Sequence, residues 1–304
     1  MLRLGIVGLG RWGRNHVRVA KELEWEGVVK LVAVCDIDEP RAKEVASKYA
    51  VPSYYASVEE MLRKEDLDAV TIAVPIDELS RVASTACEYN VNFLVEKPVA
   101  MSSRVAKELR NRAAAKGLVA MPGFIMRFNP AIEALRKILD KEQPTYAVFK
   151  RLSRRPAHAR RYSILLDLTI HDIDLARYLF GEVGRVRWCE LRPVDEDLVV
   201  LLLLEVGNML VLVHTDGVSI AKVRETDVIT RSSFIRVNTD DLEIFVRKAD
   251  VLESLSVRGE EPLKKELKSF LLKVRGVDVE TPTLDDAVRA LEIIEIAEKV
   301  NRVD

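Results

Sequence analysis

The stretch LRLGIVGLGRWGRNH, residues 2–16, decides the fold of the first part of the chain. Its apolar run up to Gly8 predicts a buried strand, and the residues from Trp12 to Glu24 predict a helix. Between strand and helix lies Gly8-Leu9-Gly10-Arg11-Trp12-Gly13, a G-x-G-x-x-G turn. This order is typical of dinucleotide-binding domains, although a glycine-rich turn that binds nothing is an alternative.

The glycine turn has the residues that a dinucleotide requires. Gly8 permits a tight turn, Gly10 lets the backbone approach a pyrophosphate, and Gly13 lets helix and strand pack closely. Asp36 ends a second predicted strand, 23 positions after Gly13, where an acidic side chain can accept hydrogen bonds from ribose hydroxyls. With Asp38 close by, a 2′-phosphate would be repelled, so NAD is predicted over NADP. Arg41 is expected on the solvated face of the next helix.

Strands and helices alternate through the first 122 residues. The strands are continuous runs of valine, isoleucine, leucine and alanine, as expected when helices cover both faces of a parallel sheet. We therefore predict a Rossmann domain, a doubly wound parallel α/β sheet, over residues 1–122. The expected strands are 2–8, 31–35, 69–74, 93–95 and 118–121, and the expected helices are 12–24, 39–49, 77–89 and 102–116.

The pattern changes after Gly123. Two long apolar segments, 198–206 and 209–215, flank Gly207-Asn208 and predict an antiparallel hairpin. Helices are expected at 131–139, 164–180, 263–274 and 285–300. Residues 123–304 are therefore predicted to form an α+β domain with an open, mostly antiparallel sheet, which binds substrate and forms oligomers.

Composition limits the possible functions. The net charge of −1 does not favour nucleic acid or a membrane surface as partner. The three cysteines, Cys35, Cys87 and Cys189, have no metal-binding spacing and suit a reducing compartment. No metal is expected. The chain begins directly with a strand, so we expect no signal peptide and a cytoplasmic protein.

Two further motifs contain residues suited to catalysis. Glu96-Lys97-Pro98 ends a short buried strand, and the proline restricts the residue before it. A solvated turn is the alternative. In the predicted helix LLDLTIHDIDLARYLFG, residues 165–181, Asp167 and His171 are four positions apart and share one face. Histidine suits proton transfer near neutral pH, but a local ion pair on the helix surface has the same spacing. Asp172 and Asp174 are expected to be solvated or to cap the helix.

Together these motifs resemble the glucose–fructose oxidoreductase/inositol dehydrogenase (Gfo/Idh/MocA) family over nearly the whole chain. The resemblance also includes Arg127-Phe128-Asn129-Pro130 and the segment 281–287. It implies an NAD(P)-dependent dehydrogenase acting on CH–OH groups, in which Lys97, His171 and Asp167 are catalytic. The implied cofactor-binding residues are Gly8, Gly10, Arg11, Trp12, Gly13, Asp36, Val74, Pro75, Glu96 and Lys97. The implied substrate-binding residues are Arg127, Asn129, Arg154, Arg155 and His158.

Within the family, the segments 127–130 and 154–174 are most similar to UDP-N-acetylglucosamine 3-dehydrogenases. The substrate is then a sugar or nucleotide sugar, and the arginines at 151, 154, 155, 160 and 161 suit a diphosphate, although a solvated basic loop is equally compatible. Two alternatives stay open: a dinucleotide-sensing regulatory protein without activity, and a reductase of another carbonyl. The apolar strands of the hairpin also predict a homodimer or homotetramer formed through the C-terminal sheet.

Overall fold

The computed structural model describes residues 1–249 and 251–301. The chain forms two compact units. The first contains Met1–Phe124 and Leu263–Val288, and the second contains Ile125–Pro262 and the chain from Arg289 onward. The sequence predicted one boundary, at residue 122. It did not predict that residues 263–288 belong to the first unit.

The first unit contains a six-stranded sheet in which every neighbouring pair of strands is parallel. The strand order is β3-β2-β1-β4-β5-β6, the order of a dinucleotide-binding Rossmann fold. The strands are β1 (Leu2–Val7), β2 (Val29–Cys35), β3 (Ser53–Tyr55), β4 (Ala69–Ile72), β5 (Asn92–Glu96) and β6 (Ala120–Gly123). The helices that connect them are α1 (Arg11–Trp25), α2 (Glu39–Tyr49), α3 (Val58–Lys64), α4 (Ile76–Glu88) and α5 (Ser103–Ala115).

The core of this unit explains the apolar runs of the sequence. All four residues of β4 are buried, as are the last four of β1 and of β5, because helices pack against both faces of the sheet. Several strands differ from prediction in extent: β2 begins at Val29, β4 ends at Ile72, and β6 spans Ala120–Gly123 where 118–121 was expected. The short strand β3 had no expected counterpart.

Helix α8 (Pro262–Val274) belongs to the first unit although it follows the C-terminal sheet in the chain. Its Lys264 Nζ lies 3.6 Å from Glu22 Oε2 of α1 and 2.6 Å from Oε1 of Glu26, the residue directly after α1. Leu267, Phe270 and other apolar residues of α8 are fully buried. The apolar face of this helix therefore completes the core of the first unit.

The second unit contains an eight-stranded sheet with the order β14-β13-β12-β11-β7-β10-β9-β8. All neighbouring pairs are antiparallel except β7 and β10, so the predicted open, mostly antiparallel sheet is confirmed. The hairpin also forms as predicted, with Val206 opposite Met209 and Gly207 at a φ of +56°. The strands are β7 (Pro144–Leu152), β8 (Val183–Val194), β9 (Asp197–Val206), β10 (Met209–Asp216), β11 (Val223–Thr230), β12 (Phe234–Asn238), β13 (Glu243–Lys248) and β14 (Val251–Ser256).

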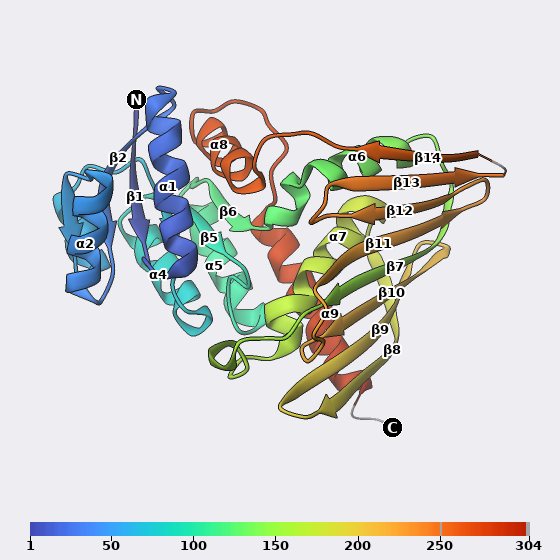
Figure 1. The fold of residues 1–304 in the computed structure, drawn as a ribbon. Coiled ribbons are helices and arrows are strands. Elements are labelled where there is room, and N and C mark those ends of the chain that lie inside the picture. The colour runs from blue at the N-terminus through green and yellow to red at the C-terminus, as the bar shows by residue number, and fades with distance from the viewer. Residues whose placement is uncertain (250, 302–304) are drawn as a thin grey trace. The chain divides into compact units, whose positions relative to one another are not determined.

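One face of this sheet is covered by helices α6 (Pro130–Leu139) and α7 (Ile170–Phe180), as Figure 1 shows. Along β9 and β10, Leu202, Leu204 and Val211 point to the covered face and are fully buried. Leu203 and Leu210 alternate with them, and Leu210 is 40% exposed. Among the described residues, no helix lies on that opposite face.

The predicted helix 164–180 consists of two parts. Leu165–Thr169 form a π-helical turn, and α7 follows from Ile170 to Phe180. Thr169 Oγ1 donates toward Ile164 O (3.4 Å), the spacing of a π-turn, and contacts Thr215 Oγ1 of β10 at 3.0 Å. The wider turn contains Asp167, and such turns are frequent at functional sites. The final helix, α9, spans Leu284–Val300.

Candidate active site

The glycine turn lies where strand β1 ends and helix α1 begins. Gly8 has a φ of +88°, and a Cβ on it would lie 2.5 Å from Ala73 O. A Cβ on Gly13 would lie 1.7 Å from Gly8 O, so only glycine lets strand and helix approach this closely. A Cβ on Gly10 would meet nothing within 4 Å, which leaves open space over the turn. Gly10 also precedes the start of α1, where unpaired N–H groups and the helix dipole suit a pyrophosphate.

Asp36 lies directly after β2 and beside the glycine turn, as a ribose-binding carboxylate requires. It is 7% exposed, and its Oδ2 accepts a hydrogen bond from Leu9 N at 2.7 Å. Its Oδ1 accepts from Asp38 N and from Arg41 Nη1, both at 3.0 Å. These contacts fix the carboxylate. Oδ1 already accepts two hydrogen bonds, whereas Oδ2 accepts one and retains a lone pair for a ribose hydroxyl.

The expectation for Arg41 is wrong. Its guanidinium does not extend along the solvated face of α2 but forms a bridge between Asp36 and Asp38, with Nη2 2.9 Å from Asp38 Oδ2. Arg41 lies in the first turn of α2, close to the N-cap Asp38, so the side chain can reach back to both carboxylates. One positive and two negative charges therefore surround the position expected for the ribose.

Glu96, the last residue of β5, connects this strand to the cofactor turn. Its Oε1 accepts hydrogen bonds from Trp12 Nε1 at 2.6 Å and lies 3.0 Å from His16 Nε2. A Cβ on Gly123 would lie 3.0 Å from Glu96 Oε2, so Gly123 leaves room for the carboxylate. His16 is fully buried on α1, so this contact is part of the core of the first unit.

A second buried carboxyl, Glu266 of α8, lies near Glu96. Glu266 is 0% exposed, and neither of its oxygens has a hydrogen-bond partner among the described residues. Burial, reinforced by the negative charge of Glu96, raises the pKa of Glu266 well above the ordinary value for glutamate. The sequence contains one usable signal for this residue: Glu266 falls on the apolar face of a helix, between Leu263 and Phe270.

Lys97 follows Glu96 at the carboxyl end of the parallel sheet and is half-buried. The Lys97-Pro98 peptide bond is cis. Val74 and Pro75 follow the neighbouring strand β4 at the same edge, where Pro75 precedes α4. The first unit therefore gathers its expected cofactor residues at the edge where open α/β sheets bind ligands.

Asp167 and His171 belong to the second unit. Asp167 lies in the π-turn, and its Oδ2 accepts a hydrogen bond from Arg155 Nε at 3.0 Å. His171 follows in the first turn of α7, and its Nδ1 is buried. The convergence of these two residues with Lys97 stays a prediction.

The expectation that Asp172 and Asp174 are solvated is wrong. Both are buried and form two-point ion pairs with arginines. Asp172 accepts from Arg151 Nε and Nη2 at 2.8 and 2.6 Å. Asp174 accepts from Arg127 Nε and Nη2 at 2.9 and 2.5 Å. Carboxylates between buried Ile173 and Leu175 on a helix are the sequence signal for such buried pairs.

Two of the expected substrate-binding residues have structural contacts. Arg127 is buried and its guanidinium is committed to Asp174. Asn129 accepts from Ala131 N at 2.9 Å as the N-cap of α6, and its Nδ2 donates to Thr239 O at 3.0 Å. Their participation in substrate binding stays a prediction, and these contacts already explain both side chains.

The five arginines between 151 and 161 do not form one cluster. Arg151 and Arg155 are buried in ion pairs, Arg160 pairs with Glu196, and Arg161 stacks 4.6 Å from the ring centre of Tyr162. Arg154 is exposed, and no ion pair joins it to an acidic residue of the described chain. His158 is also exposed, in a short 3-10 turn, Ala157–Ala159.

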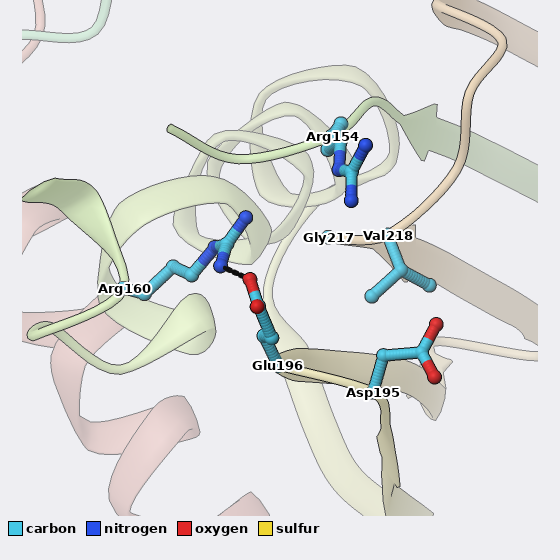
Figure 2. A pocket seen from close by; sticks show the side chains of 6 residues that line it. All are labelled: Arg154, Arg160, Asp195, Glu196, Gly217 and Val218. Carbon is cyan, nitrogen blue, oxygen red and sulfur yellow. Dashed lines mark hydrogen bonds and ion pairs between the residues drawn. The ribbon is translucent and has the colours of Figure 1, made fainter. Parts of the chain in front are cut away.

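Arg154 borders a pocket of about 440 Å³ in the second unit (Figure 2). Arg160 and Glu196 face each other at one side, and Asp195 lies beside Val218 at the other. The remaining lining residue is Gly217. Two arginines and two acidic residues balance in charge, so the pocket lacks the strongly positive field that a five-arginine cluster would create.

No metal site was expected. Within residues 1–249 and 251–301, no group of three or more histidine, cysteine, aspartate or glutamate side chains is arranged to hold a metal ion. The helices described there are too short or too polar to cross a membrane.

Residues 2–124 match the family model described as "Oxidoreductase family, NAD-binding Rossmann fold", which is the Gfo/Idh/MocA family. Residues 2–124, which lie in the first unit, are therefore similar to the NAD-binding Rossmann domain of this oxidoreductase family. The predicted fold class is confirmed, and the match agrees with the predicted family and with NAD as cofactor.

Two relatives show which activities occur among similar proteins. A UDP-N-acetylglucosamine 3-dehydrogenase of Acidithiobacillus ferrooxidans is 32% identical over 180 residues, 59% of this chain and 55% of the relative. A scyllo-inositol 2-dehydrogenase (NAD(+)) of Bacillus subtilis is 32% identical over 190 residues, 59% of this chain and 54% of the relative. The matches thus span about half the length of both relatives.

The fold extends over the whole chain. The solved structure of the Acidithiobacillus ferrooxidans UDP-N-acetylglucosamine 3-dehydrogenase superposes with a TM-score of 0.88 and covers 99% of this chain and 98% of that one, at 24% identity. At this identity the likeness establishes the two-part architecture, and the substrate has to be inferred from the site.

Proposed function

We propose that the protein is an NAD-dependent dehydrogenase that oxidises a CH–OH group of a sugar, nucleotide sugar or polyol. The observation that carries this proposal is the connection between the glycine turn and Glu96-Lys97-Pro98. Trp12 of the turn donates to Glu96, and Lys97 is the next residue. The same hydrogen bond that fixes the cofactor turn therefore positions the lysine at the ligand-binding edge of the sheet.

The chemistry divides between NAD and three side chains. NAD, when bound, supplies the hydride acceptor. Lys97 donates a hydrogen bond to the oxygen of the reacting carbinol and stabilises its developing negative charge. His171 accepts the hydroxyl proton, and Asp167 holds the imidazole and the substrate in place. In the reverse direction the same residues protonate and polarise a carbonyl.

For the substrate, we propose a nucleotide sugar, with UDP-N-acetylglucosamine and its C3 hydroxyl as the first compound to test. The exposed guanidinium of Arg154 beside the pocket supports this choice, because it is available for a phosphate oxygen. An inositol-like polyol is the second candidate. It is favoured by the balanced charges of the pocket, since alternating arginine and carboxylate groups suit uncharged hydroxyls as donors and acceptors.

A substrate panel tests the proposal. UDP-N-acetylglucosamine, UDP-glucose, myo-inositol and scyllo-inositol are each mixed with NAD, and NADH is followed by its absorbance. Turnover of one compound, lost in Lys97→Ala and kept in the matched surface change Lys43→Ala, is the expected result. NAD binding without turnover of any compound would favour a dinucleotide sensor, and reduction of unrelated carbonyls with NADH would favour the remaining alternative.

We also propose that the protein is a cytoplasmic homo-oligomer assembled through the uncovered face of the C-terminal sheet. Leu203 and Leu210 on that face support this, because exposed apolar strands are stabilised by a second subunit. Light scattering at micromolar concentration should give a dimer or tetramer. A monomer under these conditions would contradict the proposal.

A further inference from the structure

Arg155 connects several segments of the second unit. It is 3% exposed, and its guanidinium donates four hydrogen bonds. Nε donates to Asp167 Oδ2 at 3.0 Å and Nη1 to Asp197 Oδ1 at 2.9 Å. Nη2 donates to the carbonyls of Ala159 and Tyr162 at 2.6 and 2.8 Å. Four of its five N–H donors are therefore used inside the protein, which argues against a direct contact with substrate.

Asp197, the second aspartate that Arg155 contacts, is held rigidly. Asp197, at the start of β9, is buried and also accepts from Leu198 N at 2.9 Å. A Cβ on Gly217 would lie 2.6 Å from Asp197 Oδ2, so backbone packs closely against this carboxylate. The backbone of Arg155 is fixed as well, since its N–H donates to Gly217 O at 2.8 Å. Arg155 therefore links β9 and the segment after β10 to the π-turn.

The contact with Asp167 differs from the other arginine–aspartate pairs of this helix. Arg151 and Arg127 each contact both oxygens of their aspartates. Arg155 contacts Asp167 through Oδ2 alone, and Asp167 is 19% exposed on its side chain. The single hydrogen bond restrains the Asp167 side chain through Oδ2 and leaves the other oxygen without a contact to Arg155.

We propose that Arg155 is a positioning residue, which orients the Asp167 carboxylate for catalysis through a rigid link to Asp197. This replaces the expectation that Arg155 contacts substrate, and it rests on the proposed function, in which Asp167 acts at the reacting centre. Misplacing a catalytic group by about 1 Å can reduce turnover about 10²-fold. Removal of Arg155 should therefore lower kcat about 10- to 100-fold and leave KM for NAD nearly unchanged.

The test compares Arg155→Met with Arg151→Met. Both changes remove a buried arginine that pairs with an aspartate of the same helical segment, and only the first touches Asp167. The assay is steady-state kinetics with whichever panel compound is turned over. The loss of kcat should be larger in Arg155→Met than in Arg151→Met when the two variants have the same thermal stability. In an Asp167→Asn background, Arg155→Met should lower kcat less than twofold further, because the group it positions is already altered. Equal losses in the two arginine variants, or full additivity, would overturn the proposal.

One further variant and one structure determination keep the test decisive. If Arg155→Met does not fold, because Asp197 is left as an unpaired buried charge, Arg155→Met/Asp197→Asn removes that charge and still releases Asp167. If the parent turns over no panel compound, the proposed function fails independently. A crystal structure of the folded variant then decides the positioning role: a reoriented Asp167 side chain on an intact π-turn supports it, and an unmoved carboxylate refutes it.

Discussion

Replacing Glu266 by glutamine should stabilise the protein increasingly as the pH rises. Glu266 is fully buried beside Glu96, and no donor faces either of its oxygens in the described chain. Its pKa is raised above 4.5 by burial first and by Glu96 second. The folded protein thus keeps a proton that the unfolded chain releases above pH 4.5, and this group's contribution to stability falls as the pH rises.

The magnitude follows from that difference in proton binding. For every pH unit above 4.5 over which Glu266 remains protonated in the fold, the free energy of unfolding loses about 1.4 kcal/mol. Glutamine has nearly the same shape and no charge to lose. Between pH 5 and pH 6, Glu266→Gln should therefore gain about 1 kcal/mol relative to the parent.

Denaturant unfolding of both proteins at pH 5, 6 and 7 measures this difference. Glu261→Gln, an exposed position next to the same helix, is the matched control and should show little pH-dependent gain. The neighbours His16 and Glu96 are unchanged in both variants. A stability difference between Glu266→Gln and the parent that is independent of pH would refute the reasoning, because it would mean that Glu266 binds its proton equally in the folded and unfolded chains.

Three other expectations follow from the structure. Lys97→Ala should retain NAD affinity and lower kcat about 10²-fold or more, without rescue by Lys97→Arg, because a guanidinium is bulkier and planar; kinetics and NAD titration measure both. Asp36→Ala should weaken NAD and improve the relative affinity for NADP, since Arg41 is then released from its shared ion pair; a parent that already prefers NADP would contradict this. Burial raises the pKa of Cys35 to about 12 and of Cys189 to about 11, so neither thiol should react with a thiol reagent at pH 8 before denaturation; rapid modification of the folded protein would show that they are accessible.

Most of the fold could be predicted because its determinants are local. The glycine turn and the continuous apolar strands specify a parallel sheet, and Gly207-Asn208 specifies a hairpin, without knowledge of distant residues. The position of α8 could not be predicted in this way. Its amphipathic pattern shows that one face is buried, but not which surface covers it.

The same limit applies to the site. Asp36 follows from its distance to the glycine turn, whereas the contacts of Arg41 and Arg155 depend on which carboxylates the fold brings near them. Guanidinium groups are long and flexible, so sequence spacing does not identify their partners. Sequence reasoning therefore names charged candidates for the site but does not give their pairing.

The return of α8 to the first unit affects the order in which the protein can fold during synthesis. The Rossmann sheet is complete in sequence at Gly123, but the helix that covers part of its core is contributed by residues after Pro262. At about 5–20 residues per second, a ribosome reaches α8 roughly 7 to 30 s after the last strand of the sheet. During that interval the partly covered sheet exposes the apolar surface that Leu267 and Phe270 later bury. A fragment ending at residue 124 would remain in this incomplete state and should aggregate unless α8 is supplied as a separate peptide.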